Sequence, residues 1–303
     1  MGVSKEHFEM LKAEFGQQGH TFEYYMDRRE DGTTLAQRMG EADIVVVSNI
    51  PLGEDVLRQC PRLRMLAVAF TGLDHIDLHY CDAHGIEVQN AAGYSTTAVS
   101  ELTIGLMLDL LRHVTTYDGV TRQGQGRGAF VGTELRGKTV GVVGTGAIGT
   151  AVIRLLLAFG CKVLAFSRSQ REEVRQMGVT YVDLPTLMSN SDIVTVHLPL
   201  NASTHHLISC DMLAAMRPSA LLVNTARGNV VDIPALAAAL AEGRIAGAGI
   251  DVYDSEPPLP VSHALLHAPN CLCVPHIGFV TREAFDQRAE IVFGHVRKFI
   301  SQH

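Results

Sequence analysis

The sequence predicts an α/β protein of two domains, and three observations support this prediction. The chain has 303 residues, which is too long for one ordinary domain and long enough for two that each bury a core. Short runs rich in β-branched residues alternate with longer helical patterns, as they do in βαβ units. A turn with three glycines, within residues 144–149, joins one such run to a helical segment. We therefore expect parallel sheets buried between helices.

Composition and charge exclude several kinds of partner. Hydrophobic residues make up 47% and charged residues 19%, which is typical of soluble globular proteins. The formal net charge is −7 and the basic residues are scattered, so we expect neither nucleic acid nor an anionic membrane to bind. The six cysteines include no Cys-x-x-Cys pair and no apolar leader is visible, which favours a reducing compartment and hence the cytoplasm.

Eight runs have the pattern of buried parallel strands. They begin at Ala42, Met65, Lys138, Cys161, Asp192, Ala220, Arg244 and Cys271. The first two belong to a small unit that ends near residue 95, and the others to a larger unit. Between them, the apolar stretch from Leu102 is interrupted by Asp109 and Arg112 and is too short to cross a bilayer. We expect this stretch to be a buried helix.

The segment VGVVGTGAIGT places Gly144, Gly146 and Gly149 in G-x-G-x-x-G spacing, between an expected strand and an expected helix. The first glycine permits a tight turn, the second lets the backbone approach a pyrophosphate, and the third allows close packing of helix and strand. The helix N-terminal amides would face the anion. A plain strand-to-helix turn would give the same spacing, but the flanking strand and helix favour dinucleotide binding.

Three segments that follow expected strands carry reactive side chains, namely Arg227 in TARGNVVD, Glu256 in GIDVYDSEPP and His276 in VPHIGF. The carboxyl ends of parallel strands line the ligand crevice, so these loops should converge beside the dinucleotide. Arginine can hold a carboxylate, histidine can exchange a proton near neutral pH, and a carboxylate can orient the imidazole. Each residue alone could be a surface or capping group, but the three together favour catalysis.

The chain resembles the D-isomer-specific 2-hydroxyacid dehydrogenases from about Ala42 to its C-terminus. The segments AFTGLDHIDL, GVVGTGAIG, VHLPLNAST, TARGNVVD, GAGIDVYDSEP and PHIGFVT follow the family's signatures in order. The resemblance implies a Rossmann-type dinucleotide-binding domain at residues 96–280. It also implies a smaller flavodoxin-like substrate domain, formed by residues 1–95 together with 281–303. The implied activity is reduction of a small 2-oxo acid to the D-2-hydroxy acid by hydride transfer from NAD(P)H.

The resemblance further assigns roles to single residues. Arg227 would bind and polarise the oxo acid, His276 would be the acid/base, and Glu256 its partner. The backbone of Thr71, Gly72 and Leu73 would hold the substrate carboxylate. The residues expected at the dinucleotide are Gly144, Gly146, Ala147, Ile148, Gly149, Ser167, Arg168, His197, Leu198, Pro199, Thr204, Thr225, Ala226, Asp251 and His276. Within this set, Asp251 would meet the nicotinamide carboxamide, and residues 197–199 would border the adenosine half.

The chain departs from the family in two places. It begins MGVSKEHFEMLKAEFG, already helical in pattern, where relatives open with a strand, so either that strand is absent or the start of the chain is truncated. NAD-using relatives also end the second strand of the nucleotide fold with an acid for the ribose hydroxyl, and here Ser167 and Arg168 stand instead. Arg168 can pair with a 2′-phosphate that an acid would repel, which favours NADP(H) over NAD(H). The alternative is a solvated Arg168 and an enzyme indifferent to the phosphate.

No metal site is expected. The Thr-His-His cluster at residues 204–206 has no H-E-x-x-H spacing, and adjacent histidines are more often solvated. We place Cys271 and Cys273 on opposite faces of a strand, where they would fill the core and could not hold an ion jointly. In GLDHIDL, helix capping by Asp74 competes with a substrate role for Asp74 or Asp77.

Two other functions remain open at this point. Dinucleotide-sensing corepressors share the fold and the Arg, Glu and His, but generally carry extra segments that are not visible here. Formate or phosphite oxidation on the same scaffold is the second alternative function.

For a reductase, AFTGLDHIDL and SNIPLGEDV supply no extra basic residue, which favours small acids such as glyoxylate, hydroxypyruvate or pyruvate. The apolar stretch 100–114 and the glycine-rich stretch 122–132, expected to be a mobile or interface loop, match the segment through which relatives form two-fold homodimers.

Overall fold

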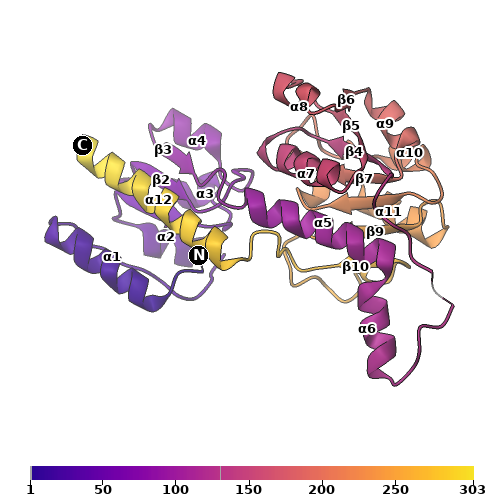
Figure 1. Ribbon diagram of the computed structural model, residues 1–303. Coiled ribbons are helices and arrows are strands. Elements are labelled where there is room, and N and C mark those ends of the chain that lie inside the picture. Colours follow the sequence, from indigo (N-terminus) through magenta and orange to yellow (C-terminus); the bar gives the residue numbers. More distant parts are fainter. Residues whose placement is uncertain (1, 130) are drawn as a thin grey trace. The chain divides into compact units, whose positions relative to one another are not determined.

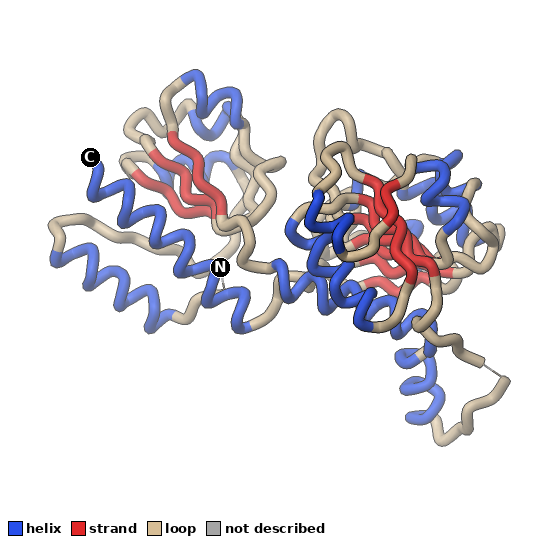
Figure 2. Tube along the Cα trace, turned by 45° about the horizontal axis from the view of Figure 1, so that its top comes forward, coloured by secondary structure: helices blue, strands red, loops and turns tan. Residues whose placement is uncertain are grey.

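The computed structural model describes residues 2–129 and 131–303, which form two compact units (Figure 1, Figure 2). Unit 1 comprises Met1–Ser95 with Val280–His303, and unit 2 comprises Thr96–Phe279. Both ends of the chain therefore belong to unit 1, and one continuous stretch forms unit 2. Each unit has its own parallel sheet.

Unit 1 is built on a three-stranded sheet in the order β1-β2-β3. Its strands are β1 (Ile44–Val47), β2 (Met65–Val68) and β3 (Glu87–Asn90), and its helices are α1 (Lys5–Gln17), α2 (Gly32–Met39), α3 (Glu54–Leu57), α4 (Leu78–Ala83) and α12 (Arg282–Gln302). Every residue of the central strand β2 is buried, because strands flank it on both sides and helices cover it.

The C-terminal helix α12 packs on this sheet, against β2 and β3. Its Phe293 is buried beside Phe15 of α1 and beside Phe22. At the surface, Arg297 of α12 pairs with Glu14 of α1 at 2.6 Å. The last helix therefore completes the core of the unit that the first residues begin. Helix α1 is also the first described element of the chain.

Unit 2 contains a seven-stranded parallel sheet in the order β10-β9-β8-β7-β4-β5-β6. Its strands are β4 (Thr139–Val143), β5 (Lys162–Phe166), β6 (Thr180–Tyr181), β7 (Ile193–Val196), β8 (Leu221–Asn224), β9 (Gly247–Ile250) and β10 (Cys271–Cys273). Its helices are α5 (Thr96–Arg112), α6 (Val114–Arg122), α7 (Ala147–Ala158), α8 (Glu172–Gln176), α9 (Leu184–Asn190), α10 (Cys210–Ala214) and α11 (Ile233–Ala241), with 3-10 turns η1 (Gly228–Val230) and η2 (Ala264–Leu266). The strand order reverses between β4 and β7, which is where open α/β sheets form a ligand crevice.

Helices cover both faces of the larger sheet (Figure 2). The interior strand β4 shows why such a strand has no polar face. Val140 and Val142 join the core beneath α5 and α7, whereas Val143 joins the core beneath α9, α10 and α11. A strand buried on both faces needs a continuous apolar run, which is the pattern that the sequence shows.

The predicted α/β class is confirmed, and each of the eight predicted runs contains a strand. Two strands were not predicted. β3 has the sequence EVQN and lies at the edge of the smaller sheet, and β6 has only two residues at an edge of the larger one. Neither edge strand carries an apolar run, because each is covered less completely than a central strand. Among the described residues, no helix is both long and apolar enough to span a membrane.

Candidate active site

The glycine loop of residues 144–149 joins β4 to α7 and leaves open space before the helix. Gly144 has φ +103°, and a side chain there would collide with the His197 carbonyl. A Cβ at Gly149 would collide with the Gly144 carbonyl, so helix and loop are in close contact. Around Gly146, no described atom lies within 4 Å of where a Cβ would stand, and no described side chain caps α7. The free amides at the positive end of α7 therefore fit a pyrophosphate.

The segment after β7 lies beside this loop, because β4 and β7 are neighbours in the sheet. His197 Nε2 lies 3.0 Å from Thr195 Oγ1, and burial lowers the pKa of His197 to about 3. The ring is therefore neutral at physiological pH. The Thr204 hydroxyl donates to the Pro199 carbonyl at 2.7 Å, which closes the turn of residues 199–204 directly after Leu198. The geometry puts this turn at the crevice, and its contact with adenosine stays a prediction.

Ser167 and Arg168 follow β5, the other neighbour of β4. Ser167 is half-buried and Arg168 is exposed. In the described part of the chain, no acidic side chain pairs with Arg168, whereas the nearby Arg171 pairs with Glu173 at 3.2 Å. Arg168 is therefore available to an anionic ligand.

Tyr181 links the two loops, and sequence reasoning did not single it out. Its hydroxyl donates to Thr145 Oγ1 at 2.9 Å and accepts from the Arg171 amide at 3.1 Å. Thr145 is a buried member of the glycine loop, and Arg171 ends the stretch that begins at Ser167. The partners are 36 and 10 residues from Tyr181, so no local pattern marks this connection.

Arg227 follows β8 and is held in place by Asn224, the last residue of that strand. Asn224 is buried, and its Nδ2 donates to the Arg227 carbonyl at 2.9 Å. Its Oδ1 accepts from the Ala226 amide at 3.1 Å. The Thr225 hydroxyl lies 2.9 Å from Thr103 Oγ1 of α5. These contacts fix the backbone of the loop that carries the guanidinium, and Asn224 is a second functional residue that sequence reasoning missed.

Glu256 and His276 meet although 20 residues separate them. His276 Nδ1 lies 2.9 Å from Glu256 Oε2 and 3.0 Å from Oε1. The histidine side chain is 12% exposed and the glutamate side chain 48%. A carboxylate only accepts hydrogen bonds, so Nδ1 carries the proton of this contact, and Nε2 is the nitrogen for which a proton exchange with the ligand is predicted. The pair has the geometry of an acid/base oriented by a carboxylate.

Asp251, which directly follows β9, holds the loop that carries His276. Its Oδ1 accepts from the Ile277 amide at 2.6 Å, and its Oδ2 accepts from the Gly278 amide at 2.9 Å. His276 has φ +56°, a left-handed conformation that persists in such a residue only where the surroundings fix it. The Asp251 carboxylate supplies that support. Its contact with a nicotinamide carboxamide stays a prediction.

Asp251 should also make stability depend on pH. Burial raises the pKa of Asp251 to about 6, so the folded chain holds this proton more tightly than the unfolded chain does. The resulting stabilisation is fully present below about pH 4 and is lost as the pH rises through about 6. Relative to Asp251→Asn, the wild type should therefore lose about 3 kcal/mol of unfolding free energy between about pH 4 and pH 7, measured by urea titration.

The matched control is Asp183→Asn. Asp183 caps α9 by accepting from the Thr186 amide at 2.7 Å, and hydrogen bonds from the Thr186 hydroxyl and amide lower the pKa of Asp183. The stabilisation that Asp183 provides is therefore present at neutral pH and lost in acid. The difference in unfolding free energy between wild type and variant should thus change with pH in opposite directions for Asp251→Asn and Asp183→Asn. A wild-type advantage over Asp251→Asn that stays constant with pH would contradict the assignment.

Unit 1 carries the loop for which a carboxylate-binding role is predicted, Thr71–Leu73. The Ala91 amide donates to the Phe70 carbonyl at 3.1 Å, and Asn90 Nδ2 donates to the Thr71 carbonyl at 2.7 Å. Among the described residues, the amides at positions 71, 72 and 73 donate to no acceptor. The Thr71 carbonyl is therefore held within the unit, while these three amides are open to an acceptor, and their contact with a substrate carboxylate stays a prediction.

Two predictions about single residues are wrong. Cys271 and Cys273 lie on the same face of β10, with their Sγ atoms 3.6 Å apart, because residues two positions apart on a strand point to the same side. Both are half-buried. Asp77, not Asp74, caps a helix, since its side chain accepts from the Tyr80 amide at 2.9 Å where α4 begins.

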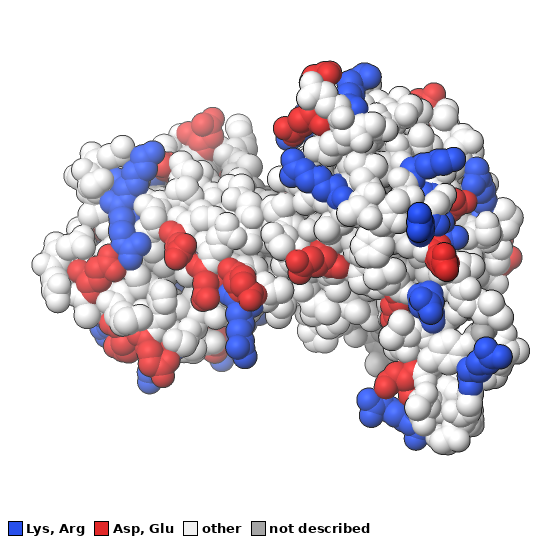
Figure 3. Space-filling model, in the orientation of Figure 1, with Lys and Arg blue, Asp and Glu red and all other residues white. Residues whose placement is uncertain are grey.

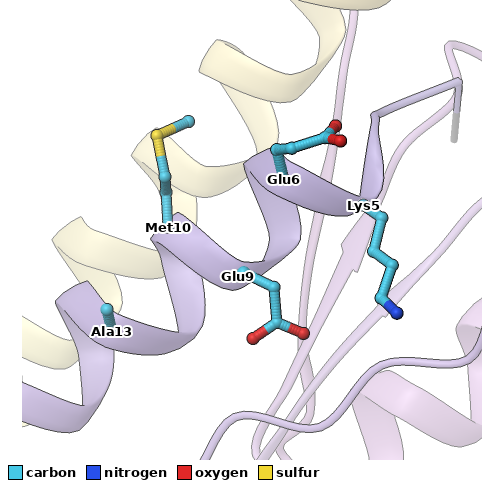
Figure 4. Close-up of a pocket in the computed structure, with 5 residues that line it drawn as sticks. All are labelled: Lys5, Glu6, Glu9, Met10 and Ala13. Carbon is cyan, nitrogen blue, oxygen red and sulfur yellow. The ribbon is translucent and has the colours of Figure 1, made fainter.

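Other surface features do not compete with this site. Within the described ranges, no group of three or more His, Cys, Asp or Glu side chains could hold a metal ion, and His205 and His206 are exposed and stacked. One hollow lies on a single face of α1, lined by Lys5, Glu6, Glu9, Met10 and Ala13 (Figure 4). Another, of about 570 Å³, lies at the amino ends of the larger sheet's strands, and neither hollow contains a predicted site residue. Basic and acidic side chains are interspersed on the face that Figure 3 shows.

Comparison with known proteins identifies the family of the chain. The model of the family described as "D-isomer specific 2-hydroxyacid dehydrogenase, NAD binding domain" matches residues 104–278. This range includes the glycine loop, Arg227, Glu256 and His276. It therefore covers every candidate group described above in unit 2.

Relatives and a solved structure agree with this match. A glyoxylate reductase of Thermococcus litoralis is 37% identical over 268 residues, which cover 85% of this chain and 80% of the relative. A hydroxypyruvate reductase of Thermotoga maritima is 38% identical over 253 residues, which cover 82% of each chain. The D-lactate dehydrogenase of Aquifex aeolicus, complexed with NAD and lactic acid, is similar with a TM-score of 0.88 at 28% identity, over 99% of this chain and 94% of that one. The chain thus belongs to the D-isomer-specific 2-hydroxyacid dehydrogenase family and is an NAD(P)-dependent oxidoreductase.

Proposed function

We propose that this protein reduces a small 2-oxo acid to the D-2-hydroxy acid, with NADPH as the preferred hydride donor. The observation that carries the proposal is the contact of 2.9 Å between His276 and Glu256, in a unit that also presents Arg227 and a glycine loop. β8, β9 and β10 are adjacent parallel strands, so the loops that follow them share one edge of the sheet. A proton donor, a carboxylate binder and a dinucleotide loop are the parts that carbonyl reduction requires.

Each side chain of the site has its own role in the proposed reduction. Bound NADPH would supply the hydride to the carbonyl carbon. Arg227 binds the substrate carboxylate and stabilises the charge that develops on the carbonyl oxygen. His276 donates its Nε2 proton to that oxygen, and Glu256 stabilises the imidazolium through Nδ1. Reduction needs the charged imidazole and oxidation the neutral one, so the two directions should have opposite pH dependence.

The proposed preference for NADPH rests on Ser167 and Arg168. The exposed, unneutralised guanidinium after β5 can pair with a 2′-phosphate, and Ser167 places no negative charge beside it. In the same scheme, the loop of residues 144–149 holds the pyrophosphate, and residues 225–226 and Asp251 border the nicotinamide end.

Tyr181→Phe should weaken dinucleotide binding and reduce the preference for NADPH. The change removes the hydroxyl that ties Thr145 to Arg171, and each neutral hydrogen bond contributes about 1 kcal/mol, so KM for NADPH should rise roughly 5-fold. Steady-state kinetics with both dinucleotides would measure this. Tyr80→Phe is the control, since that ring stacks on His84 in unit 1, and it should leave both KM values unchanged.

Small unbranched acids are the proposed substrates. Relatives of this chain are named as glyoxylate and hydroxypyruvate reductases, and the segments at residues 48–56 and 69–78 contain no basic residue except His75. That imidazole contacts the Ser48 carbonyl at 2.9 Å. These two segments offer no lysine or arginine side chain to an additional phosphate or carboxylate on the substrate, so phosphorylated and dicarboxylic acids should be poor substrates.

Initial rates separate the candidate functions. The panel comprises glyoxylate, hydroxypyruvate, pyruvate, a phosphorylated and a branched oxo acid with NADPH or NADH, and formate and phosphite with NADP⁺ or NAD⁺. Reduction of the small acids supports the proposal. Binding of NADPH without any turnover would favour a dinucleotide-sensing role, and oxidation of formate or phosphite would favour the third function.

We further propose a homodimer in a reducing compartment, the cytoplasm. The apolar face of α5 is buried inside unit 2, so the surface left for a partner is α6 and the segment after it. No residue of α6 is buried, and Val114 and Val131 are 58% and 85% exposed. All six cysteines are free thiols. A monomer in small-angle scattering at micromolar concentration would refute the dimer.

A further inference from the structure

Arg288 of α12 is a cation inside the core of unit 1. Only 2% of its surface is exposed, and its guanidinium lies 4.8 Å from the Phe285 ring centroid and 5.3 Å from that of Tyr94. Burial lowers the pKa of Arg288 and a hydrogen bond with Tyr94 acts in the opposite sense, but an arginine keeps its charge at neutral pH. Burying a charge opposes folding, so packing alone does not account for arginine at this position.

The guanidinium contacts the backbone two residues before the predicted carboxylate-binding loop. Arg288 Nη1 donates to the Ala69 carbonyl at 3.4 Å, across 219 residues of sequence. The next two carbonyls, of Phe70 and Thr71, are held by donors at residues 90–91. Three successive carbonyls therefore point toward donors of unit 1, and the amides that follow are the ones without an acceptor among the described residues. The buried guanidinium is therefore hydrogen-bonded to the same backbone segment that carries those amides.

A buried positive charge and a set of backbone amides discriminate between ligands in different ways. Backbone amides can donate to any acceptor of suitable shape, whether it is neutral or anionic. A buried cation adds an attraction that only a charged ligand gains, and the attraction is large because water screens it poorly. A loop that has both should prefer an anion over a neutral analogue of the same shape.

We propose that Arg288 is a specificity-determining residue that makes the Thr71–Leu73 loop selective for a carboxylate anion. It holds the Ala69 carbonyl and places a fixed positive charge behind the free amides. The inference rests on the proposed function only in taking the substrate carboxylate as that anion.

The test compares variants of the full chain. Arg288→Met keeps the volume and removes the charge, Arg288→Lys keeps the charge, and Arg297→Met is the matched control because it removes one charge from the exposed side of the same helix. Kinetics are measured with pyruvate and with its neutral amide, pyruvamide, and oxalate binding is measured by calorimetry. Arg288→Met should raise KM for pyruvate and Kd for oxalate roughly 10-fold, because the variant loses the attraction between one buried unit charge and the carboxylate.

The remaining measurements distinguish an effect of the Arg288 charge from an effect on the structure of unit 1. In Arg288→Met, kcat/KM for pyruvamide and KM for NADPH should stay unchanged, and Arg288→Lys should bind oxalate almost as well as the wild type. If pyruvate and pyruvamide lose efficiency together, or if oxalate binds Arg288→Met as tightly as the wild type, the proposal fails. Oxalate binding needs no turnover, so it tests the role of Arg288 even if the wild type reduces no oxo acid. An absence of oxo-acid reduction would refute the proposed function and not the role of Arg288. If circular dichroism shows that Arg288→Met does not fold, Arg288→Gln takes its place against Arg288→Lys.

Discussion

His276→Ala should lower turnover of a 2-oxo acid by about 10² to 10⁴-fold, the usual contribution of a general acid. Glu256 lies 2.9 Å from His276 Nδ1, so the ring is held with Nε2 as the nitrogen that exchanges the proton. Alanine leaves only water to protonate the carbonyl oxygen. The loss should fall on kcat, with KM for NADPH little changed, and absorbance of NADPH over pH 5 to 9 would measure both.

Two further variants locate the effect. Glu256→Gln keeps a hydrogen-bond acceptor but cannot stabilise an imidazolium, so its rate should lie between those of the wild type and His276→Ala. His205→Ala removes an exposed histidine of the same unit and should have no effect. Turnover of His276→Ala within a few-fold of the wild type would show that another group supplies the proton.

Arg168→Ala should remove most of a preference for NADPH that we expect to be roughly 10-fold to 150-fold in kcat/KM. A hydrogen bond to a charged group contributes about 1.5 to 3 kcal/mol, which corresponds to that range. The change should raise KM for NADPH and leave NADH almost unaffected, because only the former carries the 2′-phosphate. Since Arg168 is exposed, raising the salt concentration should also narrow the wild-type preference.

Ser167→Asp should invert the selectivity. A carboxylate at the end of β5 repels a 2′-phosphate and can accept a hydrogen bond from the ribose hydroxyl of NADH. Arg171→Ala is the control for charge, because this neighbouring arginine is paired with Glu173 and its loss should not change the ratio. If the wild type prefers NADH, or if Arg168→Ala leaves the ratio of kcat/KM for NADPH and NADH unaltered, Ser167 and Arg168 have no role in choosing the dinucleotide.

The sequence by itself determined the fold class and most of the larger sheet, because strands buried on both faces must be apolar along their whole length. The run around Val140, Val142 and Val143 shows this directly, since its residues alternate between two cores. The glycine spacing was equally informative, because Gly144 and Gly149 are the positions where the backbone leaves no room for a side chain. Edge strands such as β3 were missed because exposure relaxes that requirement.

Only the tertiary structure decided how the site is held. Asp251 supports the left-handed backbone at His276, Tyr181 ties the two dinucleotide loops together, and Arg288 reaches Ala69 across 219 residues. Local patterns report what a residue's own strand or helix demands, namely burial, periodicity and turn geometry. A hydrogen bond between distant segments depends on where the chain brings them, so residues such as Arg288 follow no periodic rule and become visible only when the units are folded.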